Sequence, residues 1–280
     1  MFLFVIVLYN MTALDSPAVT SLLNQRSLLA ARGIHLLLVD NTPGIAANSS
    51  VVDSDIHYLA FGENKGLAMA YQSAFRFAMA AGRRYLVLCD QDSEISKEYI
   101  DSLGVVSREA SSRVGIWAPS MVCNGSAISP YSFNRFGRPD YSVRGPSARL
   151  YGINSCSVLN MSFIGAIGGF DEFYWLDGLD GWIFEQAHRT GWAVRRLNVA
   201  IAHKLSLLSG QVPVARLSCI AYYDSCLAVE CGSIARIIST IVRLAIRGMW
   251  RLPVSWRGYW SYLCEIVAGA RMGWKRRPER

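Results

Sequence analysis

The first 120 residues alternate between short apolar runs and segments with the composition of helices. Apolar runs of strand length are found at residues 2–8, 34–39, 85–89 and 114–119, with a further short strand expected near 56–61. Helices are predicted over 15–33, 66–81 and 97–110, because capping residues precede these segments or glycine ends them. Strands that are apolar throughout and alternate with helices predict an α/β fold, with a mainly parallel sheet covered on both faces.

The remainder of the chain departs from this rhythm. Residues 120–152 are rich in Ser, Gly, Pro and Arg and predict a long, partly irregular excursion, after which the strand-like SCSVLN at 155–160 resumes the body. Residues 160–204 are expected to hold a short helix, the segment GGFDEFYWLDGLD, a helix near 180–190 and two more apolar strands. Beyond about residue 215 the chain reads as helices rich in Arg and Trp. We therefore expect an α/β domain over residues 1–210 and a helical region over 211–280.

The positive charge belongs almost wholly to the C-terminal region. Residues 201–280 hold 12 Lys/Arg and 4 Asp/Glu, whereas residues 1–200 hold 16 and 17. Such a basic region favours a polyanionic partner, either membrane phospholipid or nucleic acid, but no nucleic-acid-binding motif accompanies the charge. We therefore expect a membrane surface rather than nucleic acid.

Residues 233–250 predict an amphipathic helix within this basic region. On it, Arg236, Arg243 and Arg247 lie within about 40° of one another, and most other positions are apolar. Arginines with nearby Trp and Tyr suit a helix lying on an anionic membrane. The alternative is a helix that packs on the body and leaves its arginines exposed.

Three further patterns favour a cytoplasmic protein. The N-terminal MFLFVIVLYN has no basic region and no cleavage site, so a buried strand is expected there and not a signal peptide. No window offers the roughly 20 uncharged apolar residues of a membrane span. The seven cysteines form no C-x-x-C pair, which is typical of reduced thiols.

Polar side chains follow the predicted strands at their carboxyl ends, where parallel sheets bind ligands. They are Tyr9, Asn10, Asp40, Asp90 and Asp92. Carboxylates at i and i+2 can converge on Mg²⁺ or Mn²⁺, although a turn that caps the next helix has the same pattern. The sequence has neither G-x-G-x-x-G nor G-x-x-x-x-G-K-[ST], so a nucleotide's phosphates must be neutralised in another way.

Two more motifs carry candidate polar groups. Asn64, Lys65 and Gly66 precede a predicted helix, whose N-terminal N–H groups can bind an anion or be capped by Asn64. His203 follows an apolar run and reads either as a core residue or as a metal ligand.

The segment at 168–182 combines carboxylates with aromatic rings. Asp177 and Asp180 stand among Trp175, Trp182 and other aromatic residues, a combination that suits a sugar, whose C–H face stacks and whose hydroxyls need an acceptor or base. The alternative is that one acid caps the following helix and the aromatic rings belong to the core.

Taken in order, these motifs resemble a known family. The set Y-N (9–10), V-D-N (39–41), E-N-K-G (63–66), D-Q-D-S (90–93), G-G-F-D-E (168–172), D-G-L-D (177–180) and A-H (202–203) is similar to that of the family 2 glycosyltransferases. These are inverting enzymes of the GT-A fold, and the set looks most like that of bacterial rhamnosyltransferases. The resemblance covers roughly residues 2–205.

The resemblance implies a role for each motif. Residues 1–115 would form the nucleotide-sugar half and 116–210 the acceptor half. Asp92 and His203 would bind the metal, and Asp180 would be the general base that takes a proton from the acceptor hydroxyl. The donor-binding set would be Tyr9, Asn10, Asp40, Asn64, Lys65, Gly66 and Asp90, and the acceptor-binding set Trp175, Asp177 and Trp182. The chain departs from the family pattern at Gln72, Ala74, Trp182 and Gln186.

The implied reaction is metal-dependent and inverting. L-rhamnose or a related sugar would pass from a dTDP-sugar to a bacterial surface glycan (O-antigen or a similar polysaccharide), and a lipid-linked glycan is one form of this acceptor. Mg²⁺ or Mn²⁺ would neutralise the leaving diphosphate. A UDP- or GDP-sugar donor is the nearest alternative. A nucleotidyltransferase and an inactive membrane-associated scaffold are the others. The expected location is the cytoplasmic face of the inner membrane.

Overall fold

The computed structural model describes residues 1–44, 53–109, 113–142, 149–202, 213–251 and 256–277 of the chain. Its strands are β1 Phe2–Leu8, β2 Ile34–Asp40, β3 Ile56–Ala60, β4 Tyr85–Asp90, β5 Val114–Cys123, β6 Ser126–Ser129, β7 Ser132–Phe133, β8 Pro139–Asp140, β9 Val158–Asn160 and β10 Ala193–Ala202. The helices are η1 Ala13–Asp15 (a 3₁₀ turn), α1 Pro17–Leu23, α2 Arg26–Ala31, α3 Gly66–Ala80, α4 Lys97–Arg108, α5 Met161–Ala166, α6 Leu179–Arg189, α7 Val214–Cys231, α8 Ile234–Arg251 and α9 Trp256–Arg276.

The main sheet is mixed and mainly parallel, as the strand pattern predicts. Its order is β10-β5-β9-β4-β1-β2-β3, and β6 adds to β5 as an antiparallel neighbour. Strands β1 to β4 run parallel to one another, whereas β9 is antiparallel to both β4 and β5. The polar residues at the carboxyl ends of β1, β2 and β4 therefore lie at one edge of the sheet.

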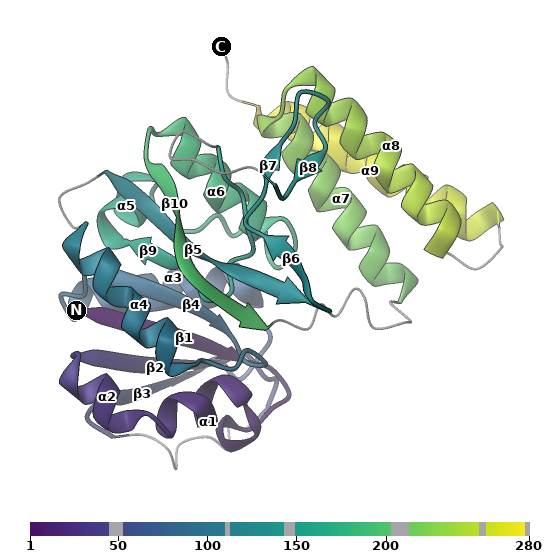
Figure 1. The fold of residues 1–280 in the computed structure, drawn as a ribbon. Helices are drawn as coiled ribbons and strands as arrows, with labels where there is room; N and C mark the ends of the chain where they lie inside the picture. The colour runs from purple at the N-terminus through teal and green to yellow at the C-terminus, as the bar shows by residue number, and fades with distance from the viewer. Residues whose placement is uncertain (45–52, 110–112, 143–148, 203–212, 252–255, 278–280) are drawn as a thin grey trace.

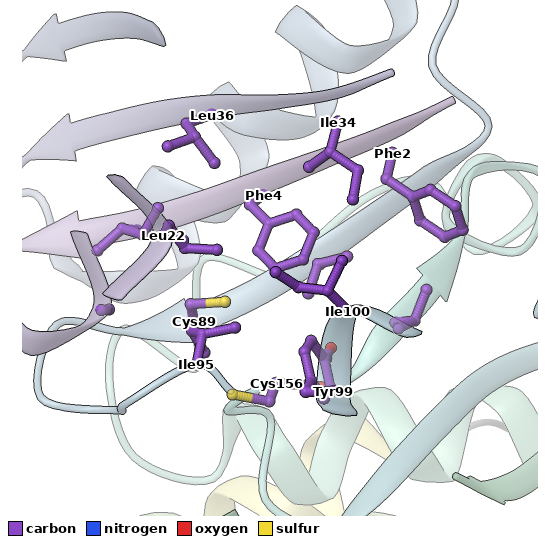
Figure 2. Packing of buried hydrophobic residues seen from close by; sticks show 14 of the residues in the cluster. Phe2, Phe4, Leu22, Ile34, Leu36, Cys89, Ile95, Tyr99, Ile100 and Cys156 are labelled. Atoms are coloured by element: carbon purple, nitrogen blue, oxygen red, sulfur yellow. Dashed lines mark hydrogen bonds between the residues drawn. The ribbon is translucent and has the colours of Figure 1, made fainter. Parts of the chain in front are cut away.

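Helices cover both faces of the sheet, and β1 shows why its sequence is apolar throughout. Phe4 and Ile6 point to the face covered by α1, α2 and α4, while Leu3 and Val5 point to the face covered by α3, α5 and α6. Figure 2 shows the first face, where Phe4 packs among residues of neighbouring strands and of α4. A strand buried on both sides cannot alternate with polar residues.

Two sequence-based boundaries are corrected by tertiary contacts. The helix expected over 15–33 is broken into α1 and α2, and the Gln25 side chain at the break donates to the backbone oxygens of Ser21 and Ile95. In the range 160–204 the described residues hold β10 as the one new strand, where two were expected. The described part of the excursion at 120–152 holds β6 and a small hairpin of β7 and β8.

The three C-terminal helices lie beside the sheet body (Figure 1). They share a small apolar core of their own, formed by Leu217 and Ala221 of α7, Leu244 of α8, and Tyr262 and Ile266 of α9. Among the helices that the structure describes, none is both long enough and apolar enough to cross a membrane.

Candidate active site

A cavity of about 780 Å³ lies where the strand ends meet the C-terminal helices. Its wall includes Tyr9 from the end of β1, Asp90 from β4, Asp180 from α6 and Asp224 from α7, with α8 closing the far side. The predicted edge of the sheet is therefore one wall of the cavity. The opposite wall comes from a part of the chain more than 100 residues away.

The D-Q-D-S segment divides its side chains between the cavity and the fold. Asp90 and Asp92 line the cavity. Gln91 accepts a hydrogen bond from the Tyr9 N–H (2.8 Å) and donates to the Tyr9 carbonyl (3.3 Å), which fixes the end of β1 against the end of β4. Ser93 is fully buried, 2.9 Å from the Ser155 hydroxyl. The two carboxylates thus stand on a segment that the intervening residues hold in place.

The loop after β2 presents Asn41 to the cavity, not the expected Asp40. Asp40 is 2% exposed and accepts hydrogen bonds from the Tyr58 hydroxyl (2.7 Å) and the Thr42 N–H (3.0 Å). Asn41 lines the cavity and donates from its side-chain amide to Asn64 Oδ1 (2.9 Å). A nucleotide in the cavity would therefore meet Asn41 before Asp40.

The N-terminus of α3 is satisfied by the protein itself. Asn64 Oδ1 accepts from the Gly66 N–H (3.1 Å), and the Trp175 carbonyl accepts from the N–H groups of Leu67 and Ala68. These amides are therefore already bound within the protein, with Asn64 holding the Gly66 N–H from the position before the N-cap residue Lys65.

Gly66 and its neighbour have different surroundings. Gly66 has φ +83°, and a Cβ there would overlap the Trp175 indole ring, so both the backbone and the ring require glycine. The Lys65 ammonium group lies 3.3 Å from Glu63 and outside the cavity wall, as does Asn10. Of this motif, Asn64 and Gly66 line the cavity.

Asp180 is the most perturbed carboxyl group of the cavity. It lies in the first turn of α6, and burial, followed by the negative charge of Asp90, raises its pKa to about 7. The backbone N–H of Asn154 acts against this shift. A carboxylate with this pKa is well matched to accept a proton near neutral pH.

The other members of the aromatic segment lie in different environments. Asp177 lines the cavity and pairs with Arg216 (2.6 Å), yet burial raises its pKa to about 6. Trp175 also lines the cavity and is half-exposed. Neither acid caps α6, because Gly178 with φ +77° occupies the N-cap position.

Trp182 does not reach the cavity. It is 6% exposed and packs in the core, with its ring centroid 6.3 Å from that of Tyr174. The expected acceptor contact of Trp182 is therefore wrong, because this position on α6 faces the body rather than the cavity.

The basic wall of the cavity is formed by Arg216, Arg236, Arg243 and Arg247, so the arginines of α8 line the cavity. The helix also packs against α7 and α9, and Arg243 is exposed, as the second sequence-based alternative expected. Arg236 is buried, pairs with Glu185 (3.0 Å) and lies over the Phe133 ring (4.2 Å). Beside it, burial raises the pKa of Asp224, while Arg243 and then Arg247 lower it. The helix lies where the sequence predicted it, and its arginine face lines the cavity.

Two polar residues near Asp180, Asn154 and Tyr71, are not among the candidates that the sequence motifs indicate. Asn154 lines the cavity and is 2% exposed, and neither atom of its side-chain amide has a hydrogen-bond partner in the described part of the chain. The Tyr71 hydroxyl is also buried and unpartnered. Both residues sit in segments that gave no motif. Unsatisfied buried polar groups beside a cavity are typical of positions that a ligand or water completes.

The donor set for a metal is small within the described residues. Asp90 and Asp92 both line the cavity, whereas His203 lies outside the described residues. No group of three or more His, Cys, Asp or Glu side chains that could hold a metal ion occurs in the described ranges. Two carboxylates nevertheless suit Mg²⁺, which commonly binds one or two protein carboxylates together with water and substrate phosphates.

The departures from the family pattern have structural roles in two cases. Gln72 accepts a hydrogen bond from the Phe170 N–H (2.9 Å) and so holds the G-G-F segment. Ala74 is fully buried in the core between α3 and the sheet.

Known proteins resemble this chain in sequence and in fold. Residues 4–103 match the model of "Glycosyl transferase family 2". The dTDP-rhamnosyl transferase RfbF of Shigella flexneri is 22% identical over 204 residues, covering 70% of this chain and 63% of that protein. The chain thus spans about 63% of the length of this curated relative.

The similar solved structures include TarS of S. aureus. The crystal structure of TarS 1–349 in complex with UDP-GlcNAc has a TM-score of 0.58 at 11% identity, covering 96% of this chain and 81% of that one. A second TarS structure has a TM-score of 0.53 at 12% identity, covering 98% and 55%. At these identities the likeness shows the fold.

Proposed function

From a chain that carries a glycosyl transferase family 2 domain and has the GT-A glycosyltransferase fold, we infer that it transfers a sugar from a nucleotide donor with inversion. The donor sugar we propose is L-rhamnose or a related deoxyhexose on dTDP, in line with the similarity to a dTDP-rhamnosyl transferase. The acceptor we propose is a bacterial surface glycan that is built on a lipid at the cytoplasmic side of the inner membrane.

The observation that carries this proposal is the position of Asp180. Its carboxyl group lies in the cavity wall near Asp90, within a pocket large enough for a donor and an acceptor, and its pKa is raised to about 7. An acceptor hydroxyl bound there would give its proton to Asp180 as its oxygen attacks the anomeric carbon. A single displacement of this kind inverts the anomeric centre and needs no protein nucleophile.

The donor would lie along the strand ends. Tyr9, Asn41 and Asn64 form the wall there and offer an aromatic ring and amide groups to the nucleoside. Asp90 and Asp92 are the residues that would hold Mg²⁺ or Mn²⁺. When bound, such an ion supplies Lewis-acid stabilisation of the charge that develops on the departing diphosphate.

The acceptor would enter from the side of α7 and α8. Trp175 offers a half-exposed indole ring on which the C–H face of a sugar can stack. Asp177 and Arg216 form an ion pair at the same wall and can exchange hydrogen bonds with sugar hydroxyls.

The replacement Asp180→Asn tests the mechanism. We expect the turnover number to fall by about 10²–10⁴-fold, because the amide cannot accept the proton. Binding of dTDP, measured by thermal shift beside UDP and GDP, should be retained, since Asp180 is not part of the donor wall. The matched control is Asp101→Asn on the exposed surface of α4.

Two outcomes would contradict the proposal. Full turnover of Asp180→Asn with every nucleotide sugar would exclude Asp180 as the base. Stabilisation of the wild-type protein by UDP or GDP but not by dTDP would exclude the dTDP-sugar donor.

A further inference from the structure

Helix α8 has three faces with different surroundings. Leu244 and Gly248 pack against the neighbouring helices. Thr240, Arg243 and Arg247 line the cavity. The third face is apolar and exposed, with exposed fractions between 48% and 84%, and consists of Ile234, Ile238, Val242, Ile246, Met249 and Trp250. We call it the outward face of α8.

Within the basic wall, the arginines differ in their partners. Arg216 is paired with Asp177, and Arg236 with Glu185. Neither Arg243 nor Arg247 makes a hydrogen bond or an ion pair to another residue in the described part of the chain. Two guanidinium groups therefore face the cavity with hydrogen-bond donors to spare, and such groups match phosphate oxygens in geometry and charge.

These two arginines and the donor wall come from different parts of the fold. Tyr9, Asn41 and Asn64 stand at the strand ends and before α3, whereas Arg243 and Arg247 stand on α8, in the C-terminal helices. We therefore assign an anion held by Arg243 and Arg247 to the acceptor and not to the donor diphosphate.

The outward face of α8 suits a lipid surface. Its six apolar side chains include a terminal Trp250 and no charge, and contiguous exposed apolar side chains commonly mark an interaction surface. The surrounding region is strongly basic, since residues 201–280 hold 12 Lys/Arg and 4 Asp/Glu, which complements an anionic bilayer. A helix that lies in the bilayer surface is placed at the level of the lipid phosphates.

We propose that α8 lies on an anionic membrane through its outward face and that Arg243 and Arg247 bind the phosphate or diphosphate of a lipid-linked sugar acceptor. This proposal rests on the proposed transfer function and adds the chemistry of its acceptor. One helix thereby fixes the height of the cavity above the bilayer and recognises the charged link between lipid and sugar.

The phosphate subsite is tested with geranyl diphosphate, a short soluble probe, and with dTDP as the probe of the donor wall. In isothermal titration, the double variant Arg243→Ala/Arg247→Ala should bind geranyl diphosphate at least about tenfold more weakly and dTDP within about twofold of the wild type. The control Arg271→Ala/Lys275→Ala removes two exposed charges from α9 and should leave both affinities unchanged. Unchanged binding of geranyl diphosphate, or an equal loss for dTDP, would overturn the assignment.

The membrane face is tested by sedimentation with vesicles of phosphatidylglycerol and phosphatidylcholine in equal parts. The variant Ile238→Glu/Val242→Glu should bind at least about tenfold more weakly than the wild type. The control Met79→Glu/Val105→Glu replaces exposed apolar residues of α3 and α4 and should bind normally. Unchanged binding of the α8 variant would contradict the proposal.

Two further readouts separate the alternatives. If light scattering shows a wild-type dimer that the α8 variant loses, and neither protein binds vesicles, the outward face is a contact between copies and the membrane proposal is wrong. Neither arm measures turnover, so a failure of the transfer function, seen with Asp180→Asn, can be told from a failure of this proposal.

Discussion

Neighbouring residues at this cavity have different roles, because one side chain points into the cavity and the next holds the fold. Asp90 and Asp92 line the cavity, while Gln91 between them holds the end of β1. Asp40 is buried against Tyr58, while the next residue, Asn41, faces the cavity. In extended chain successive side chains alternate between sides, so a shift of one residue exchanges a binding group for a structural one.

The raised pKa of Asp180 lowers the free energy of unfolding at neutral and higher pH, and this loss can be measured. Its pKa is about 7 in the folded chain and 3.8 in the absence of the fold, so folding loses stability from this group as the pH rises from about 4 to 7. The replacement Asp180→Asn removes that loss. We expect a gain of about 1–3 kcal/mol in the free energy of unfolding at pH 8 and little change at pH 4, without added metal.

Urea unfolding of both proteins at the two pH values checks this prediction. A variant that is destabilised at pH 8 would show that the carboxylate of Asp180 is stabilised by contacts and not strained by burial. The control Asp101→Asn concerns an exposed carboxylate whose pKa is lowered by Lys97, and it should not gain stability at pH 8.

Two helices, α3 and α8, have polar groups that could bind a ligand but that also make contacts within the protein. The first amides of α3 are bound by Asn64 and by the Trp175 carbonyl. In α8, Arg236 pairs with Glu185 of α6, and the arginine face of the helix lines the cavity. In both cases, a contact with a residue distant in the sequence decides whether these amide or guanidinium groups remain available to a ligand.

The start of α3 gives a sharp test of this point. Gly66→Ala would place a methyl group in the Trp175 ring and force alanine to a φ of +83°. We expect a loss of about 1–3 kcal/mol in the free energy of unfolding and a change in tryptophan fluorescence, because the ring must move.

The matched control is Gly104→Ala. Gly104 lies inside α4, with no contact closer than 3.5 Å at its Cβ position, and alanine there should stabilise the protein by about 0.5–1 kcal/mol. Equal effects of the two replacements would show that the Trp175 contact does not constrain Gly66.

For the whole molecule, ion pairs link the C-terminal helices to the sheet body and to one another. Arg276 at the end of α9 pairs with Asp171 of the body and with Glu230 of α7, and its guanidinium group lies 4.1 Å from the Phe173 ring centroid. The cavity is formed between these two parts of the chain, so its shape depends on how they dock.

Removing this anchor should affect the whole molecule. Arg276→Ala leaves the buried carboxylate of Glu230 without its ion-pair partner, although the Tyr174 hydroxyl still donates to it, and we expect the free energy of unfolding to fall by about 3 kcal/mol. Arg271→Ala, five residues earlier and exposed, should change it by less than about 0.5 kcal/mol. Thermal denaturation of the two variants decides, and similar curves would contradict the proposed anchor.

Local patterns in the sequence predicted most of the elements and the fold class. Runs of apolar residues marked β1, β2 and β4. The capping residues expected before the first and third predicted helices are Ser16, which accepts from the Val19 N–H, and Ser96, which accepts from the Tyr99 N–H. These signals are local, because a cap or a strand depends on residues within a few positions. The order of short motifs along the chain also identified the glycosyltransferase fold before any contact was known.

Only the tertiary structure decided which of the candidate residues share the cavity. It removed Trp182 to the core, turned Asp40 toward Tyr58, and brought Asn154 to the cavity wall. It also brought the arginines of α8 to the cavity wall, although the sequence showed only that they share one face of a helix. The rotation of a helix about its axis is set by contacts with distant segments, and a periodic pattern states only that a face exists, not what it will meet.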